Sequence, residues 1–122
     1  KGPKERTPEN FYHGFVLGLI VSLKKEYRIV SNRESGRGRY DIAMYPLKEC
    51  ADAFIIEFKV FDAAKEKDLE ETAQRALEQI DSRGYEADLL ASGIEKERIY
   101  KLGFGFKEKD VVIRMEAEIC RK

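Results

Sequence analysis

Two charged residues lie inside the most apolar stretch of the chain. Residues 53–61 read Ala-Phe-Ile-Ile-Glu-Phe-Lys-Val-Phe, which is typical of a buried β-strand, yet they include Glu57 and Lys59. Because side chains alternate faces along a strand, Glu57 and Lys59 share one face, and apolar side chains fill the other. A charge in such a place is costly to desolvate unless it is paired or binds a metal. The two residues therefore indicate either a structural ion pair or an active site.

A third charged residue, Asp41, lies at the head of the strand predicted over residues 40–45. An antiparallel meander would place this strand beside residues 53–61, so that Asp41 and Glu57 converge, with Lys59 about 7 Å along the strand from Glu57. Two carboxylates, a backbone carbonyl and water are hard oxygen ligands that suit Mg²⁺ or Mn²⁺. A nearby ammonium could orient an attacking water and stabilise charge on a phosphate. Together these groups suffice for metal-assisted phosphodiester hydrolysis.

The rest of the chain must form the elements that position these residues. Apolar spacing and turn residues predict a single α/β domain, more narrowly an α+β fold with a mixed sheet. Residues 1–7 are expected to be a flexible N-terminal segment, and residues 8–122 the folded domain. The predicted elements are a helix over 8–25, strands over 27–31, 40–45 and 53–61, a helix over 65–83 with Gly84 as its C-cap, a short helix over 85–91, and strands over 98–106 and 111–119.

The first predicted helix is apolar almost all round, so we expect it to be well buried. Gly14 and Gly18 would let it approach a sheet closely. His13, the single histidine, lies in this helix and is interpreted as a core residue in preference to a general base. The apolar run over residues 15–21 is too short to cross a bilayer, so no membrane partner is expected.

Composition limits the classes of function that the chain can have but does not select one of them. The chain has 122 residues, with 23 basic and 23 acidic side chains, so no overall basic charge indicates nucleic-acid binding. Residues 24–39 are locally basic, which is compatible with a phosphate-binding surface or with a solvated face. Cys50 and Cys120 form no CxxC pair, which argues against a thiolate zinc site and suits a reducing cytoplasm. Because the first residue is Lys1, we expect a piece of a longer protein.

Several short stretches resemble the PD-(D/E)XK nuclease superfamily, whose restriction-endonuclease-like core has the order αβββαβ. The signature would be Tyr40-Asp41 followed by Glu57-Phe58-Lys59, with Tyr40 in place of the motif's proline. More narrowly, the chain is similar to the nuclease-like C-terminal domain of a bacterial AAA-ATPase-like family. The matching stretches are residues 11–15, 31–41, 55–60 and 76–80, followed by Tyr85, and the resemblance covers Pro8 to about Phe106.

The resemblance implies a role for each motif residue. Asp41 and Glu57 would hold Mg²⁺ or Mn²⁺, with the Phe58 carbonyl as a further ligand. Lys59 would position and activate water, and Gln79 matches a glutamine that many relatives carry on the helix after the third strand. The implied partners are a nucleic acid, DNA in the leading hypothesis, and an N-terminal ATPase domain. No Walker A motif occurs in this chain, so that domain would lie outside it.

Of the other candidate residues, Arg37, Arg39 and Glu34 have two interpretations each. Arg37 and Arg39 would grip a phosphate or decorate an exposed hairpin. Glu34 would be an extra carboxylate near the metal or the partner of a neighbouring arginine. Tyr85 would pack the start of its helix against the sheet.

Two functions remain open at this point. The intact set of Asp41, Glu57 and Lys59 favours a metal-dependent nuclease that acts on DNA. The neutral net charge favours a catalytically silent domain that keeps the nuclease fold and binds nucleic acid or protein. The oligomeric state is left open.

Overall fold

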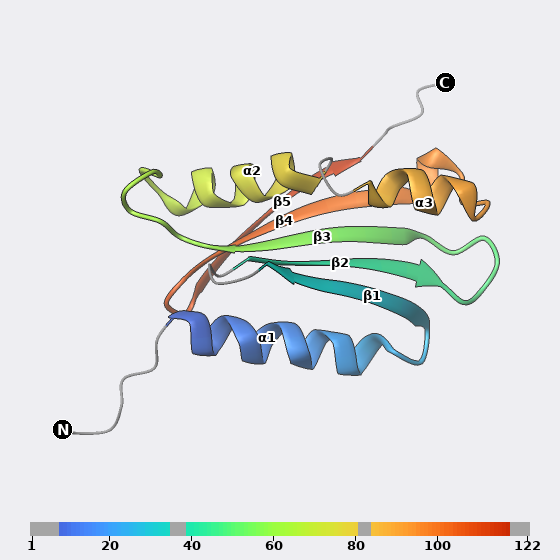
Figure 1. Ribbon diagram of the computed structural model, residues 1–122, viewed down its shortest axis with the longest axis horizontal. Helices are drawn as coiled ribbons and strands as arrows, with labels where there is room; N and C mark the ends of the chain where they lie inside the picture. Colours follow the sequence, from blue (N-terminus) through green and yellow to red (C-terminus); the bar gives the residue numbers. More distant parts are fainter. Residues whose placement is uncertain (1–7, 35–38, 81–83, 118–122) are drawn as a thin grey trace.

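The computed structural model describes residues 8–34, 39–80 and 84–117, with side chains from residue 14 onward except those of 33, 34, 39 and 117. Within this part of the chain five strands form one mixed sheet whose strands follow chain order (Figure 1). The strands are β1 (Tyr27–Glu34), β2 (Arg39–Pro46), β3 (Ala53–Val60), β4 (Ile99–Lys107) and β5 (Asp110–Ala117). The predicted α+β domain with a mixed sheet is confirmed. The predicted flexible segment 1–7 lies outside the described residues.

The strand directions explain how helices cover both faces of the sheet. β1, β2 and β3 form the predicted antiparallel meander, whereas β4 runs parallel to β3. A parallel pair needs a crossover connection, which contains α2 (Leu69–Gln79) and α3 (Tyr85–Ala91) on one face. The first helix, α1 (Pro8–Leu23), lies on the opposite face (Figure 1). The core order is therefore the predicted αβββαβ, with α3 as an addition before β4.

The α1 face of the sheet holds an aromatic core. The rings of Phe58 and Phe104 lie 5.0 Å apart, and Phe15 of α1 packs 5.3 Å from Phe106. The fully or nearly buried members of this core are Val16, Ile42, Met44, Ile56, Phe58, Phe104 and Phe106. Their burial follows from β-strand alternation, since every second residue of β3 faces α1.

The helix α1 is less buried than its sequence suggests. Leu17 is 55% exposed and Val21 is 68% exposed. A Cβ added at Gly14 or Gly18 would meet no atom within 4 Å. The prediction of an all-round buried helix with close glycine contacts is therefore wrong, because α1 packs against one sheet face on one of its sides only. The helix also ends at Leu23, two residues before the predicted end.

The helix α2 approaches the sheet closely, and glycines of β4 allow this approach. A Cβ on Gly103 would lie 2.4 Å from the Ala73 carbonyl oxygen, and one on Gly105 would lie 2.9 Å from the Ala73 nitrogen. Real Cβ atoms do not approach backbone this closely, so the α2 backbone rests directly on these two glycines. The buried apolar side chains of this face are Ala53, Ile55, Leu77, Ile80, Leu89 and Ile99.

The bounds of α2 differ from the prediction in a way that matters for the site. The helix begins after Asp68, whose side chain accepts a hydrogen bond from the Glu71 N–H at 2.9 Å, and not at Lys65. Residues 62–66 form a separate turn. Gly84, with a φ of 76°, is the N-cap of α3 and not the C-cap of α2, which is Ile80.

The strand bounds agree with the predictions more closely. β1 runs three residues further than predicted, to Glu34, and β2 includes Pro46, one residue beyond its predicted end. β5 is described only to Ala117, so the predicted end at Ile119 lies outside the described residues. No helix in the described part of the chain is both long and apolar enough to cross a membrane.

Candidate active site

The pairing of β2 with β3 brings the two predicted carboxylates together. Asp41 lies directly opposite Glu57 in the antiparallel register. Side chains at opposed positions project to the same face, with Cβ atoms about 4.5–5.5 Å apart. Asp41 is 1% exposed and Glu57 is 0% exposed, so both carboxylates lie within the fold beneath the crossover helices. Such burial of two acids side by side is costly in free energy and is typical of a site that binds a cation.

Tyr85 contacts the Asp41 carboxylate from the crossover connection. It is the first residue of α3, and its hydroxyl donates a hydrogen bond of 2.7 Å to Oδ1 of Asp41. The left-handed backbone of Gly84 starts the helix at this point. The phenol therefore fixes the orientation of the Asp41 carboxylate, a contact beyond the packing role that the sequence predicted for it.

Lys59 lies on the same face of β3 as Glu57 and contacts a residue that sequence reasoning missed. Its ammonium is 2.5 Å from Oε2 of Glu66, and the Glu66 side chain is 0% exposed. Glu66 also accepts hydrogen bonds from the Asp62 N–H at 2.9 Å and from the Thr72 hydroxyl at 2.8 Å. Lys59 therefore forms an ion pair with Glu66, a partner that differs from the Glu57 considered from the sequence.

The pKa of Glu66 reflects this environment. Burial raises the pKa of its carboxyl, but hydrogen bonds from Lys59, the Asp62 N–H and Thr72, with the charge of Lys59, lower it below its ordinary value overall. Glu66 is therefore ionised and matched by positive charge at neutral pH.

A sequence signal for Glu66 did exist. Asp68 and Glu71 have the spacing of a helix N-cap followed three residues later by an acid. This pattern starts the helix after Asp68, and it moves Glu66 from the predicted helix into the connection that follows β3.

Lys59 and Gln79 line one hollow beside α2. The hollow has a volume of about 690 Å³ and includes residues from the end of β3, the 62–66 turn and α2. Lys59 reaches it with a side chain that is 14% exposed. The charged and amide residues around it are Lys59, Asp62, Lys65, Glu66, Arg75, Glu78 and Gln79. Gln79 thus lies at the same hollow as Lys59, and its predicted role beside the carboxylates stays a prediction.

The glycines of β4 lie beside the charged residues of β3. Gly103 pairs with Glu57, and Gly105 pairs with Lys59, in the parallel register. Because neither glycine has a side chain, the α2 backbone fills the space next to both charges. This role was not predicted from the sequence, although the repeat Gly103-Phe104-Gly105-Phe106 alternates small and large residues at strand spacing.

A comparison with protein families agrees with this arrangement. The family model of the PD-(D/E)XK nuclease superfamily matches residues 7–116. The chain belongs to the PD-(D/E)XK nuclease superfamily. No match was found among curated proteins or among solved structures.

Members of the PD-(D/E)XK superfamily generally use divalent metals, and the buried acids fit that chemistry. Mg²⁺ is often held by one or two carboxylates with water completing its shell. Asp41 and Glu57 supply two carboxylates on one face, while the Phe58 ring is buried on the opposite face, so only its backbone carbonyl could serve as a ligand. Among the described residues no group of three acidic, histidine or cysteine side chains forms a metal site.

Three predicted residues are placed only in part. Arg37 lies outside the described residues. Arg39 of β2 pairs with Glu34 of β1 and with Lys59 of β3, which brings all three to the same end of the sheet. The side chains of Glu34 and Arg39 are not described, so their proposed roles remain predictions.

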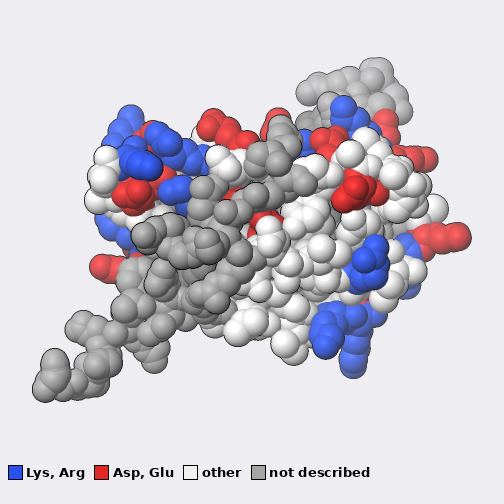
Figure 2. All heavy atoms as spheres, viewed as in Figure 1, with Lys and Arg blue, Asp and Glu red and all other residues white. Residues whose placement is uncertain are grey.

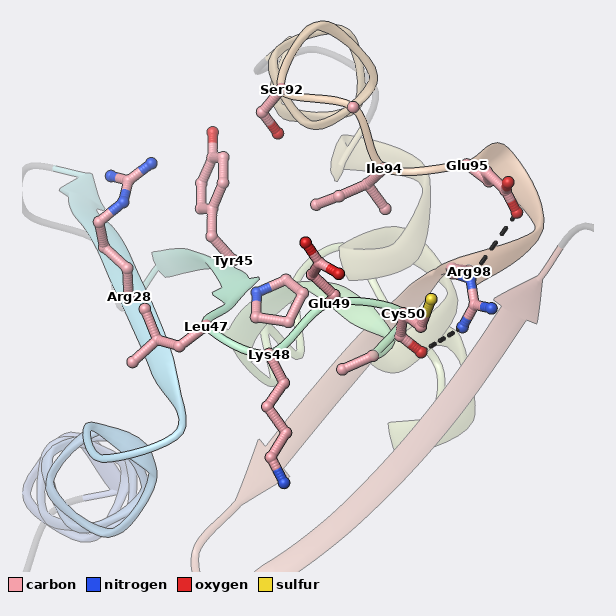
Figure 3. Close-up of a pocket in the computed structure, with 13 residues that line it drawn as sticks. Arg28, Tyr45, Leu47, Lys48, Glu49, Cys50, Ser92, Ile94, Glu95 and Arg98 are labelled. Carbon is pink, nitrogen blue, oxygen red and sulfur yellow. Dashed lines mark hydrogen bonds and ion pairs between the residues drawn. The ribbon is translucent and has the colours of Figure 1, made fainter.

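A second hollow lies at the other end of the strands from the PD-(D/E)XK motif (Figure 3). It has a volume of about 560 Å³, and the Arg28 guanidinium lies 4.2 Å from the Tyr45 ring centre at its edge. Arg98 donates a hydrogen bond of 2.5 Å to the Cys50 carbonyl and lies 3.7 Å from Glu95. Lys48 points away from the cavity in Figure 3. None of the predicted catalytic residues lines this hollow.

Proposed function

We propose that this domain is a divalent-metal-dependent nuclease that hydrolyses phosphodiester bonds in DNA. One observation supports the proposal most strongly. Asp41 lies opposite Glu57 in a buried position, and Lys59 follows two residues later on the same face. The chain belongs to the PD-(D/E)XK superfamily, and this set of residues resembles the motif of that superfamily.

In this proposal Asp41, Glu57 and the Phe58 carbonyl hold Mg²⁺ or Mn²⁺. When bound, a divalent cation supplies positive charge that stabilises the charge developing on the phosphate. Tyr85 holds the Asp41 carboxylate in one orientation through its 2.7 Å hydrogen bond. A ligand with a fixed orientation loses less entropy on binding the cation, which favours a preorganised site.

Lys59 has the role of a fixed cation at the wall of the hollow. Its ammonium orients a water molecule and stabilises negative charge on a phosphate oxygen in the transition state. Gln79 lines the same hollow and would contact the substrate or that water through its amide. The two residues would thus act from the side of α2, whereas Asp41 and Glu57 act from the sheet.

Nucleic-acid contacts are proposed at the same end of the sheet. Arg37 and Arg39 would bind backbone phosphates, and Glu34 would add a carboxylate near the metal or pair with Arg39. We also propose that the domain functions in the cytoplasm as the C-terminal part of a longer protein with an N-terminal ATPase domain.

A second candidate function is a catalytically silent domain that binds nucleic acid or protein. The burial of Asp41 and Glu57 favours it, since a substrate phosphate must reach the metal that they hold. The charge distribution favours it as well. Basic and acidic side chains of the described residues are interspersed on the face shown in Figure 2, whereas a nucleic-acid surface is commonly basic.

Cleavage of labelled DNA in the presence of Mn²⁺ tests the proposal. We expect wild type to cut, and Asp41→Asn and Glu57→Gln to be inactive because both lose a metal ligand. Glu49→Gln is the matched control, since it removes an acid from the second hollow, away from the motif. If wild type binds Mn²⁺ but cuts neither DNA nor RNA, even with its native N-terminal region attached, the silent-domain function replaces the nuclease.

A further inference from the structure

Glu66 has no role in the proposed chemistry so far, yet its buried carboxylate accepts several hydrogen bonds beside the site. Its side chain is 0% exposed and lies 2.5 Å from the Lys59 ammonium. Oε1 accepts hydrogen bonds from the Asp62 N–H and from the Thr72 hydroxyl. A buried carboxylate with three donors is held in a single position, since any rotation would break several charge-assisted hydrogen bonds.

The backbone around Glu66 is also held firmly. The Asp62 carbonyl accepts hydrogen bonds from the N–H groups of Lys65 and Glu66, at 3.0 and 2.9 Å. The Asp62 side chain accepts another from the Ala64 N–H at 3.0 Å. On the preceding side, the Phe61 N–H donates to the Phe106 carbonyl at 2.8 Å. These hydrogen bonds fix Glu66 relative to the end of β3 and to β4. A fixed Glu66 carboxylate can in turn hold the Lys59 ammonium in one position.

Lys59 can contact a substrate while it is bonded to Glu66, because a lysine ammonium has more than one hydrogen-bond donor. An ammonium has three N–H donors, and the bond to Glu66 uses one of them. The side chain is 14% exposed and lines the hollow with Gln79. The other donors can therefore face a water molecule or a phosphate oxygen.

The need to neutralise the Glu66 carboxylate does not by itself explain its short contact with Lys59. Arg75 also approaches Glu66, with its Nε 3.8 Å from Oε2, and its side chain is 44% exposed. A charge partner for Glu66 was thus available from α2 without Lys59. The structure instead directs the only buried carboxylate of the 62–66 turn at the motif lysine.

We propose that Glu66 is a positioning residue that holds the Lys59 ammonium at the wall of the hollow, oriented toward a substrate phosphate or the attacking water. The proposal rests on the proposed nuclease function for its catalytic consequence. The contact between Glu66 and Lys59 can be tested without any cleavage.

The first experiment follows the side-chain ammonium of Lys59 by ¹H–¹⁵N NMR on the metal-free protein, with Lys59→Ala as the assignment variant. We expect a resolved, slowly exchanging ammonium signal in wild type, because the hydrogen bond shields it from water. Glu66→Gln should lose this signal. Glu71→Gln is the matched control, since Glu71 is a nearby acid of α2 that accepts a hydrogen bond from the Lys67 N–H and also pairs with Arg75. It should keep the signal.

The second experiment measures DNA cleavage by the same variants. Glu66→Gln should lower kcat by roughly tenfold to a hundredfold, by analogy with the loss of a group that orients a metal ligand, with KM changed far less. Glu71→Gln should keep the wild-type kcat. If Glu66→Gln is too unstable to assay, Thr72→Val removes one donor to Glu66 with little change in shape and should lower kcat in the same direction, and Thr72→Ser should restore it.

Two results would overturn the proposal. One is a Lys59 ammonium signal that survives in Glu66→Gln. The other is loss of the signal without loss of kcat, which would leave Glu66 a purely structural residue. A wild type that cuts no nucleic acid would refute the proposed function instead, and the NMR comparison would still decide whether Glu66 holds Lys59.

Discussion

The two faces of β3 differ in what they contribute to the molecule. Toward α1, the strand presents Phe54, Ile56 and Phe58, which join an aromatic core. Toward α2, it presents Ala53 and Ile55 at one end and the charges of Glu57 and Lys59 at the other. One central strand therefore supports stability with one set of alternate residues and the candidate chemistry with the other. The apolar face is what makes the burial of charges on the opposite face tolerable.

The helices on the two faces also pack differently. On the α1 side, large side chains separate helix and sheet, and the helix glycines touch nothing within 4 Å of an added Cβ. On the α2 side, backbone lies on backbone at Gly103 and Gly105. Close packing of α2 is what brings Glu66, Thr72 and Gln79 next to the charged half of β3. Substitutions on either face should therefore have different consequences.

Phe58→Ala should cause the largest loss, about 3–5 kcal/mol of unfolding free energy, because it empties the centre of the aromatic core. Urea denaturation followed by circular dichroism measures it. Leu17→Ala is the control on the same side, since Leu17 is 55% exposed and should change stability by less than about 0.5 kcal/mol. Equal losses in the two variants would refute the division between a buried α1-face core and an exposed helix surface.

Lys59→Ala should lower DNA turnover by about 10²–10³-fold, as loss of one transition-state donor does, while Mn²⁺ binding is retained. Because this variant removes the lysine partner of the buried Glu66 carboxylate, stability is checked in the double variant Lys59→Ala, Glu66→Gln. Lys101→Ala is the matched control, since Lys101 makes a comparable ion pair of 2.8 Å with Glu86. Turnover equal to wild type in Lys59→Ala would make Lys59 a structural ion-pair partner only.

A glycine-to-alanine substitution should lower the unfolding free energy on the α2 face of the sheet and raise it in α1. Gly103→Ala should destabilise the fold by about 1–3 kcal/mol, since its Cβ would collide with the α2 backbone. Gly18→Ala should stabilise it by about 0.5–1 kcal/mol, because alanine is the better helix former and the space is open. Thermal melting of both variants checks this pair, and a stabilising Gly103→Ala would contradict the close packing of α2.

The pH dependence of stability should report on Glu66. Since the folded-state pKa of Glu66 lies below its ordinary value, its contribution is complete above that ordinary value and is lost as the pH falls through the folded-state pKa. The unfolding free energy of wild type should therefore fall more steeply under acid conditions than that of Glu66→Gln. Parallel curves for the two proteins in urea titrations below about pH 4.5 would show that Glu66 is not stabilised in its charged form.

The sequence was enough to predict the sheet that carries the motif and the pairing of its first three strands. Strand alternation is local, so Glu57 and Lys59 could be assigned to one face from their spacing alone. A meander of three short strands then placed Asp41 beside Glu57. These inferences depend on neighbours in sequence, and for that reason they hold.

The parts that could not be predicted depend on contacts between distant elements. Gly103 and Gly105 look like ordinary strand glycines until α2 is placed on them. The burial of α1 was overestimated, because apolar composition does not reveal how much of a helix a single sheet can cover. Glu66 falls inside the helix predicted over residues 65–83, whereas the N-cap at Asp68 starts the helix after it.

Calorimetric titration of Mn²⁺ into the protein tests the central claim, that the opposed acids form one metal site, most directly. We predict that wild type binds one ion. Binding to the native state should raise the unfolding free energy by roughly 2.7 kcal/mol at a hundredfold excess of Mn²⁺ over Kd. Asp41→Asn and Glu57→Gln should each abolish binding, whereas the control Glu49→Gln should bind as wild type does. Unchanged Mn²⁺ binding in both Asp41→Asn and Glu57→Gln would contradict the assignment of this pair as the metal site.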